Sequence, residues 1–204
     1  MKPESDTKRK LLETAVQLIW ESSYGSVSVD DICSKAGVNK GSFYYAFKSK
    51  SDLAVAAFER HWESKRPLLD QIFSTQVPPL DRPKNYCDVI VQDQKEKYRT
   101  FGKVLGCPFC SLGGEISTQD ENIRQKVEQM IARNIKYLES SVRDLVAEGL
   151  IESKDPQELA RELYFYVTGV LMQAKIENNL KSLDRLQHGA MRLLNVKQVP
   201  AVAV

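Results

Sequence analysis

Two short segments of this 204-residue sequence carry side chains whose types and spacing could do chemistry. The first spans residues 35–50 and holds four lysines, two tyrosines and an asparagine, with no acidic side chain. Ammonium groups bind phosphates, and amide and phenol groups can contact base edges, so this composition favours nucleic-acid binding. The second is the pair Cys107 and Cys110, separated by Pro108 and Phe109. Two neighbouring thiols can be oxidised, be alkylated or contribute ligands to a metal site.

The basic window matters more than the total charge of the chain. The formal net charge is only +2, and acidic side chains are scattered through the rest of the sequence. Nucleic-acid binders are recognised by a local basic patch, so the total charge indicates no particular partner. Because a short run of lysines is more often a solvated surface than a binding site, the hypothesis depends on the elements that present these side chains.

The residues around the basic window predict two short helices joined by a glycine turn. Ser28 precedes Asp31 by three positions, which is a capping-box arrangement that starts a helix over 29–35. Gly37 follows where a left-handed residue usually ends a helix, and Asn39 can cap the next one. The pattern is that of a helix-turn-helix.

In such a motif the second helix lies in the major groove, where only its first two turns reach base edges. Those turns run from Asn39 to Tyr45, and Gly41 would let the backbone approach the duplex. Phe43 and Phe47 share one side of this helix and are expected to pack in the core. The candidate base contacts are Lys40, Ser42 and Tyr45, the candidate phosphate contacts are Ser28, Tyr44, Lys48 and Lys50, and Asn39 and Gly41 complete the predicted DNA-binding set.

The span VDDICSKAGVNKGSFYYAFKSKSDL, residues 29–53, resembles the DNA-binding signature of the TetR family of transcriptional regulators. The departures are Cys33 for the usual alanine, Asn39 for the usual serine and Ala46 where histidine or tyrosine is common. The resemblance covers about the first 60 residues. The matching positions are Ile32, Ala36, Gly37, Val38, Gly41, Phe43, Tyr44, Phe47, Ser49, Lys50 and Leu53.

Apolar residues recurring every three or four positions predict helices through the rest of the chain, and no alternating strand pattern is found. The prolines of VPPLDRP predict a break after the fourth helix. We expect an all-α fold with a helix-turn-helix DNA-binding domain over residues 1–50 and a larger helical effector-binding and dimerisation domain over residues 51–204. The predicted helices outside the motif span residues 7–21, 50–73, 84–101, 109–117, 121–148, 156–179 and 183–194.

One helix-turn-helix domain, called a head from here on, would contact too few phosphates to bind DNA well at physiological salt. We therefore expect two heads about 34 to 36 Å apart on successive major grooves of a palindromic double-stranded operator. The segment LYFYVTGVLMQAKIE has apolar residues on more than one helical face, which indicates a partner as well as a core. The family resemblance implies a homodimer in which the last two long helices of each subunit form a four-helix bundle.

The CxxC pair has three possible interpretations: thiols that pack around an effector pocket, a redox or electrophile switch, or half of a zinc site. At the first turn of a helix, the N-terminal dipole would lower the pKa of Cys107. Similar Gly-Cys helix starts occur in a branch of TetR-like regulators, some of which respond to reactive electrophiles. Without thiol chemistry, an unidentified apolar or aromatic effector would lie among Tyr98, Phe101, Met130, Tyr137 and Phe165.

Other functional classes have less support. Zinc would need further ligands, and Cys33, Cys87, His61 and His188 are not at ligand spacing, so we expect no metal and no cofactor. No phosphate loop or Cys/His/acid arrangement indicates an enzyme, although an adaptor that no longer binds DNA stays open. With no apolar run near the ~18 residues of a membrane span and no signal-like N-terminus, we expect a cytoplasmic repressor whose operator binding is relieved by a small molecule or by thiol modification.

Overall fold

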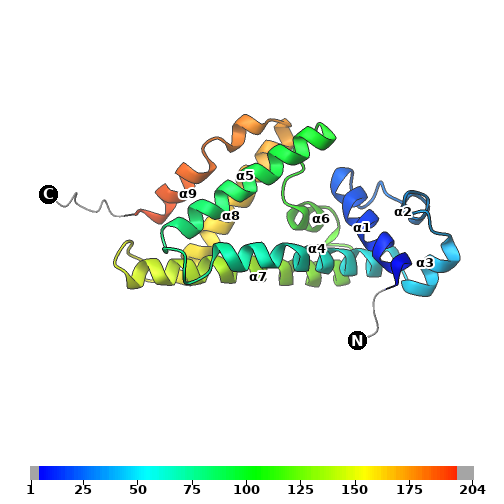
Figure 1. Cartoon of the computed structure of the whole chain (residues 1–204), viewed down its shortest axis with the longest axis horizontal. Coiled ribbons are helices and arrows are strands. Elements are labelled where there is room, and N and C mark those ends of the chain that lie inside the picture. The colour runs from blue at the N-terminus through cyan, green and yellow to red at the C-terminus, as the bar shows by residue number, and fades with distance from the viewer. Residues whose placement is uncertain (1–4, 197–204) are drawn as a thin grey trace. The chain divides into compact units, whose positions relative to one another are not determined.

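The computed structural model describes residues 5–196. Over that range the chain forms helices joined by short loops and contains no strand, so the predicted all-α fold is confirmed (Figure 1). None of these described helices is long and apolar enough to cross a membrane. The elements are α1 (Asp6–Glu21), α2 (Val29–Ala36), α3 (Lys40–Ala46), α4 (Lys50–Ile72), α5 (Asp81–Phe101), α6 (Pro108–Ile116), α7 (Glu121–Ala147), α8 (Pro156–Glu177), the short 3₁₀ helix η1 (Leu180–Leu183) and α9 (Leu186–Leu194).

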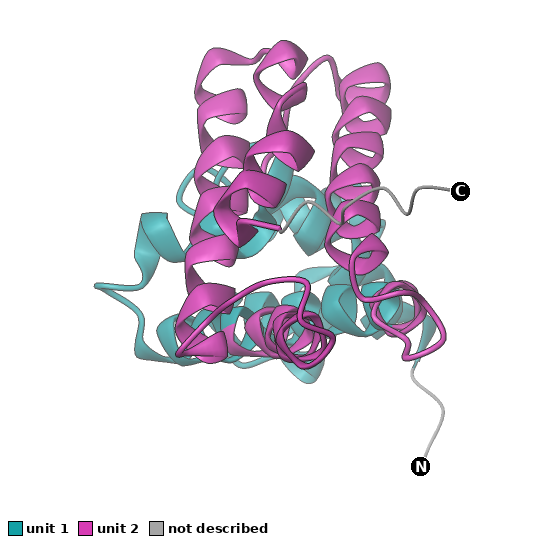
Figure 2. Cartoon of the chain, turned by 90° about the vertical axis from the view of Figure 1, so that its left-hand side faces the viewer, with its two compact units in different colours: residues 1–66, 107–131 teal, residues 67–106, 132–204 magenta. Residues whose placement is uncertain are grey.

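The chain divides into two compact units, which Figure 2 distinguishes by colour. Unit 1 comprises the chain up to Arg66 together with Cys107–Ile131, and unit 2 comprises Pro67–Gly106 and the chain from Ala132 onward. Unit 1 therefore joins the helix-turn-helix to α6, the helix that begins with the CxxC pair, and no pattern in the sequence indicates this grouping. The division into a DNA-binding domain and an effector domain after residue 50 is a functional one and stays a prediction.

The first three helices of unit 1 pack against one another around a small apolar core. Leu11 of α1, Ile32 of α2 and Phe43 of α3 are each 0% exposed, and Leu53 of α4 is equally buried. Burying a side chain of this size contributes about 1.5 to 3 kcal/mol, so these few residues are enough to fix the angle between α2 and α3.

The predicted helix ends of the motif are confirmed. In α2 the Ser28 Oγ accepts from the backbone N–H of Asp31 at 3.1 Å, and the Asp31 carboxylate accepts from the backbone N–H of Ser28 at 2.8 Å. Gly37 ends the helix with a φ of +64°, which a residue with a side chain rarely adopts. Asn39 caps α3, because its Oδ1 accepts from the backbone N–H of Ser42 at 2.8 Å. Local side-chain chemistry thus makes the turn.

In unit 2, α8 packs along α9, and α9 also packs on α5. The predicted helix over 183–194 is wrong at its start, because the chain forms η1, capped by Asn179, before α9 begins at Leu186. The fifth helix begins at Asp81, three positions earlier than predicted, with Pro83 in its first turn. A proline there loses no hydrogen bond, because the first N–H groups of a helix have no partner within it.

Candidate nucleic-acid interface

Helix α3 presents two contrasting faces. Phe43 is 0% exposed and Phe47 is 7% exposed, and their ring centroids lie 6.1 Å apart in the head's core. Tyr45 is 96% exposed and Tyr44 is 58% exposed, although the Tyr44 ring still contacts Phe43 edge-on at 5.0 Å. A tyrosine with almost no contact in its own chain gains nothing from folding, so its ring is available to another molecule. The predicted base and phosphate contacts of these residues stay predictions, but their exposure is what such contacts require.

Lys40, at the start of α3, pairs with an acid, Asp30, that lies just outside the basic window of residues 35–50. Its Nζ lies 2.7 Å from the Asp30 Oδ1, and this hydrogen bond raises the pKa of Lys40. Both side chains are more than half exposed, at 58% and 65%, so water and salt screen the pair. A phosphate or a base edge could therefore replace Asp30 at small cost.

Gly41 has a structural reason to be a glycine. A Cβ at this position would lie 3.3 Å from the Asn39 Oδ1, the atom that caps the helix. Ser42 donates its backbone N–H to the same cap, and its side chain is half-buried. These contacts account for the asparagine at position 39 and favour the glycine at position 41 without DNA, but they do not explain the serine at position 42. The predicted DNA contacts of all three residues need a test of their own.

Two predicted phosphate contacts flank the motif. Ser28 is exposed, but its hydroxyl donates to the Asp31 carboxylate at 2.6 Å and accepts from the Asp31 backbone, so it is already used in the capping box. Lys48, between α3 and α4, is exposed. Lys48 is the better candidate of the two for a phosphate contact.

Lys50, at the start of α4, is half-buried against the loop between α1 and α2. Its Nζ donates to the carbonyl oxygens of Tyr24 at 2.8 Å and Val27 at 2.9 Å, and it lies 4.1 Å from the centroid of the Tyr24 ring. Burial lowers the pKa of this lysine. An ammonium group has three N–H donors, so at most one is left for a phosphate. The main role of Lys50 in this structure is to fix the loop between α1 and α2.

The same loop is held from its other side by a residue that sequence reasoning missed. Glu115 of α6 accepts from the backbone N–H groups of Tyr24 at 2.8 Å and of Gly25 at 2.6 Å. The carboxylate binds the loop's donors while Lys50 binds its acceptors. Because about 90 residues separate Glu115 from the loop, no local pattern could have predicted the contact. Helix α6 is thereby tied to the DNA-binding head.

The CxxC pair lies at the other end of α6. Cys107 is its N-cap residue, Pro108 is its first residue, and the Cys107 thiol hydrogen-bonds with Cys110. That hydrogen bond and burial raise the pKa of Cys107 well above its usual value, although the backbone N–H groups of Phe109 and Cys110 act in the opposite direction. The expectation of a lowered pKa is therefore wrong, because the thiol partner and burial outweigh the helix terminus.

All four cysteines lie in the described part of the chain, and none forms a disulfide. Cys33 and Cys87 are buried, whereas Cys107 and Cys110 are half-buried. Among residues 5–196, no group of three or more potential metal ligands is arranged to hold an ion. The CxxC thiols are thus more accessible to small reagents than the other two.

Aromatic contacts connect the first turn of α6 to α4. The Phe109 ring centroid lies 5.9 Å from that of Phe58, 6.0 Å from His61 and 6.5 Å from Trp62. Trp20 of α1 contacts His61 edge-on at 5.3 Å. Phe109 stands between the two cysteines in the sequence, so the thiol pair and this cluster share the first turn of α6.

The residues predicted to surround an effector come from both compact units. Met130 belongs to unit 1 and is fully buried, whereas the other four belong to unit 2. Tyr137 donates its hydroxyl to Asp70 and contacts Phe73. Phe165 is 57% exposed on α8, so it is a poor candidate for an enclosed site. The effector site stays a prediction, with Tyr98 37% exposed and Phe101 half-buried.

Comparison with known proteins extends over most of the chain. A sequence model described as bacterial regulatory proteins, tetR family, matches residues 11–57, and one described as tetracyclin repressor-like, C-terminal domain, matches residues 79–190. An uncharacterized HTH-type transcriptional regulator of Lactococcus lactis subsp. lactis is 30% identical over 182 residues, 88% of each chain. The HTH-type transcriptional repressor NemR of Escherichia coli strain K12 is 28% identical over 204 residues, 98% of each chain. The crystal structure of E. coli NemR in its reduced form has a TM-score of 0.78 at 25% identity, and the match covers 96% of this chain and 100% of that chain.

Proposed function

This chain belongs to the tetR family of bacterial regulatory proteins, and we propose that it is a homodimeric repressor that releases a palindromic operator when a small molecule binds or Cys107 is modified. The observation that carries the proposal is α3, whose buried phenylalanines fix a helix that exposes Tyr45, Tyr44 and Lys40. A short helix held in this way can enter a major groove without rearranging its own core.

The electrostatic part of the proposal predicts how salt acts on a phosphate contact. Lys48→Ala should weaken binding to specific and unrelated DNA by similar factors, because a phosphate contact carries no sequence information. It should also lower the slope of log affinity against log salt by about 1 for each head, because one counterion fewer is released. The measurement is a fluorescence-anisotropy titration of labelled operator duplex at several salt concentrations.

Lys154→Ala is the matched control, because Lys154 is an exposed lysine of unit 2. It should leave both the affinity and the salt slope unchanged. If Lys48→Ala keeps the wild-type slope, Lys48 does not contact phosphate.

The thiol part of the proposal rests on the two ends of α6. Its N-terminal end carries the paired thiols, and Glu115 near its C-terminal end holds the loop between α1 and α2. A group attached to Cys107 would break the thiol hydrogen bond and enlarge the first turn, and the resulting shift of α6 would pull on that loop. The relative NemR was crystallised in a reduced form, which is consistent with thiol chemistry in such a regulator.

Two classes of reagent could modify these thiols. An electrophile would replace the hydrogen of the Cys107 thiol by a carbon group. Peroxide would oxidise Cys107 to a sulfenic acid, and the Cys110 thiol would then displace water from it to form a disulfide. Both reactions start from the thiolate, whose population is set by the raised pKa of Cys107.

Removing the second cysteine should make the first more reactive. Cys110→Ala abolishes the hydrogen bond that contributes most to the raised pKa of Cys107, so that pKa should fall. Each unit of decrease gives about tenfold more thiolate below the pKa, and lower nucleophilicity reduces the gain to roughly threefold. We expect iodoacetamide to alkylate Cys107 several times faster at pH 7.5, measured by mass spectrometry of the modified peptide.

Cys107→Ser should lose both this alkylation and the release of operator that follows it. An alkylation rate in Cys110→Ala at or below that of the wild type would contradict the assigned role of the thiol pair. Operator release that persists in Cys107→Ser would leave only the small-molecule route.

A further inference from the structure

The α5–α6 loop, residues 102–106, leads directly into Cys107. It begins and ends with glycines in the left-handed region, because Gly102 has a φ of +66° and Gly106 a φ of +68°. Its last three residues, 104–106, are buried. Buried backbone N–H and C=O groups need hydrogen-bond partners. In this loop two side chains from neighbouring helices supply several of them.

Gln94, on α5, binds the end of the loop that precedes Cys107. It is only 3% exposed. Its Oε1 accepts from the backbone N–H groups of Leu105 at 3.1 Å and Gly106 at 2.9 Å, and its Nε2 donates to the Gly106 carbonyl oxygen at 3.3 Å. Nε2 also donates to the Asp93 carboxylate at 3.3 Å. A glutamine amide has two N–H donors and two acceptor lone pairs, so all of its hydrogen-bonding capacity is used.

Asn178, at the C-terminal end of α8, binds the first part of the loop. Its Oδ1 accepts from the backbone N–H of Val104 at 2.9 Å, and its Nδ2 donates to the Gly102 carbonyl oxygen at 3.4 Å. The residue ends α8 in the left-handed conformation, with a φ of +48°. The hydrogen bonds that Gln94 and Asn178 make to the loop are called the loop clamp below.

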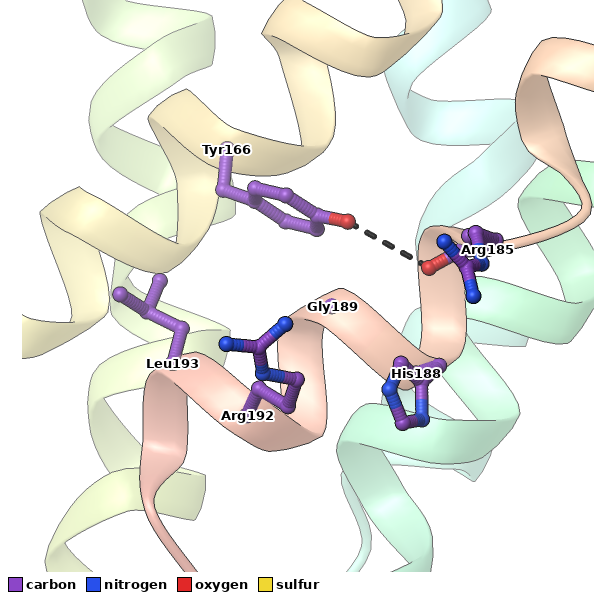
Figure 3. Close-up of a pocket in the computed structure, with 6 residues that line it drawn as sticks. All are labelled: Tyr166, Arg185, His188, Gly189, Arg192 and Leu193. Atoms are coloured by element: carbon purple, nitrogen blue, oxygen red, sulfur yellow. Dashed lines mark hydrogen bonds between the residues drawn. The ribbon is translucent and has the colours of Figure 1, made fainter.

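The helices that carry the loop clamp support one another. Helix α9 packs on both α5 and α8, and Gln187 of α9 donates to the Asp88 carboxylate of α5 at 2.9 Å. Tyr166 of α8 lies across α9 and donates its hydroxyl to the Arg185 carbonyl oxygen at 3.4 Å (Figure 3). The ring fits there because Gly189 has no side chain, and a Cβ would overlap the Tyr166 hydroxyl. The loop clamp is therefore anchored in a packed set of helices.

A fixed loop decides where a displacement of α6 can go. The α5–α6 loop belongs to unit 2, and the chain passes into unit 1 between Gly106 and Cys107. The proposed release of operator requires that a group attached to Cys107 displaces α6 and so moves Glu115. A free loop would absorb this displacement and leave Glu115 in place. With Gly106 held by Gln94, the displacement is directed along α6 toward Glu115 instead.

We infer that Gln94 and Asn178 are positioning residues that hold the start of α6 fixed, so that a modification of Cys107 moves the far end of the helix. This inference rests on the thiol route of the proposed function and adds the residues that make that route effective. Coupling between two sites is carried by connections that are too stiff to absorb a local change. The loop clamp should therefore affect how much operator affinity is lost after Cys107 has reacted, and not whether Cys107 reacts.

Two variants weaken the loop clamp by different means. Asn178→Gly keeps the left-handed end of α8, which glycine adopts readily, and removes only the side-chain hydrogen bonds to the loop. Gln94→Met keeps the approximate length of the side chain and removes its acceptor and its donors. Asn195→Gly is the matched control, because Asn195 ends α9 with a φ of +47° and has an exposed side chain.

The experiment compares operator affinity before and after the full chain is treated with iodoacetamide, until mass spectrometry shows complete modification of Cys107. Alkylation should weaken operator binding of the wild type by about tenfold or more, within the usual range for coupled sites. Fully alkylated Gln94→Met should lose no more than about threefold, and Asn178→Gly should lie between the two, because the Asn178 side chain is exposed. Asn195→Gly should respond like the wild type.

The affinity before alkylation shows whether a variant has damaged the head itself. It should stay close to the wild-type value in all three variants, because Glu115 and Lys50 still hold the loop between α1 and α2. Operator binding that is already lost without the reagent would show that the α5–α6 loop supports the head directly, and this would overturn the inference.

The remaining outcomes separate the inference from the proposed function. A fully alkylated wild type that still binds operator contradicts the thiol route and overturns the inference with it. A wild type that releases operator, together with clamp variants that release it to the same extent, overturns the inference alone. If circular dichroism shows that Gln94→Met does not fold, Asn178→Gly decides, and a wild-type loss of affinity in that variant overturns the inference.

Discussion

Replacing Tyr45 by alanine should weaken operator binding by roughly 30-fold and leave the free energy of unfolding unchanged. A single contact to a base edge contributes about 1 kcal/mol, the low end of the range for base contacts, and a dimer makes it at two half-sites. The side chain is 96% exposed, so it contributes almost nothing to the core that holds α3. Binding affinity is measured by anisotropy with a labelled operator, and unfolding by urea titration of the same sample.

Tyr45→Phe distinguishes the two ways in which this residue could act. If the ring contacts a thymine methyl, phenylalanine should keep most of the affinity, whereas a hydrogen bond from the hydroxyl would make both variants equally weak. A Tyr45→Ala protein that binds operator as well as the wild type would mean that the exposed face of α3 does not enter the groove.

The helix-turn-helix could be predicted because it is built from short-range chemistry. The capping box of Ser28 and Asp31, the left-handed Gly37 and the cap at Asn39 each involve residues within three positions of one another. Such contacts form whenever the backbone turns in the right way, so residue types and spacing are enough to identify them.

The partners of the charged residues could not be predicted, because they come from other elements. The window of residues 35–50 contains no acid, yet Lys40 pairs with Asp30 just outside it. Lys50 fits a phosphate contact by its position, but the loop between α1 and α2 supplies carbonyl groups that bind it. The sequence shows which residues carry a charge, but only the folded structure determines which group pairs with each of them.

The sequence also could not predict whether the pKa of Cys107 is raised or lowered. A helix N-terminus lowers the pKa of a thiol, but the effect is of limited size and burial opposes it. At Cys107 the neighbouring thiol, one turn away, donates to or accepts from the same sulfur, and this contribution is the largest. The CxxC spacing puts the two thiols one turn apart, but it shows neither that they hydrogen-bond to each other nor how deeply the first turn of α6 is buried.

Replacing Glu115 by glutamine should separate α6 from the DNA-binding head. The carboxylate accepts from two backbone N–H groups, whereas an amide can accept from only one and turns its own N–H groups toward the other. A hydrogen bond to a charged group contributes about 1.5 to 3 kcal/mol, and solvent at this exposed site reduces the combined loss to about 1 to 3 kcal/mol. For a chain of this size we expect the melting temperature to fall by about 3 to 10 °C.

The functional effect of Glu115→Gln follows from the same geometry. With the Glu115 contact weakened and the Lys50 contacts left in place, the loop between α1 and α2 loses its connection to α6. Operator binding should then weaken by about tenfold, and alkylation of Cys107 should no longer change it. Glu115→Asp keeps the charge on a shorter side chain and should retain part of both properties, while Glu148→Gln, at an exposed position of unit 2, should alter neither. If Glu115→Gln still releases operator on alkylation to the wild-type extent, the signal from the thiol pair reaches the head through the aromatic cluster of Phe109 and α4 instead.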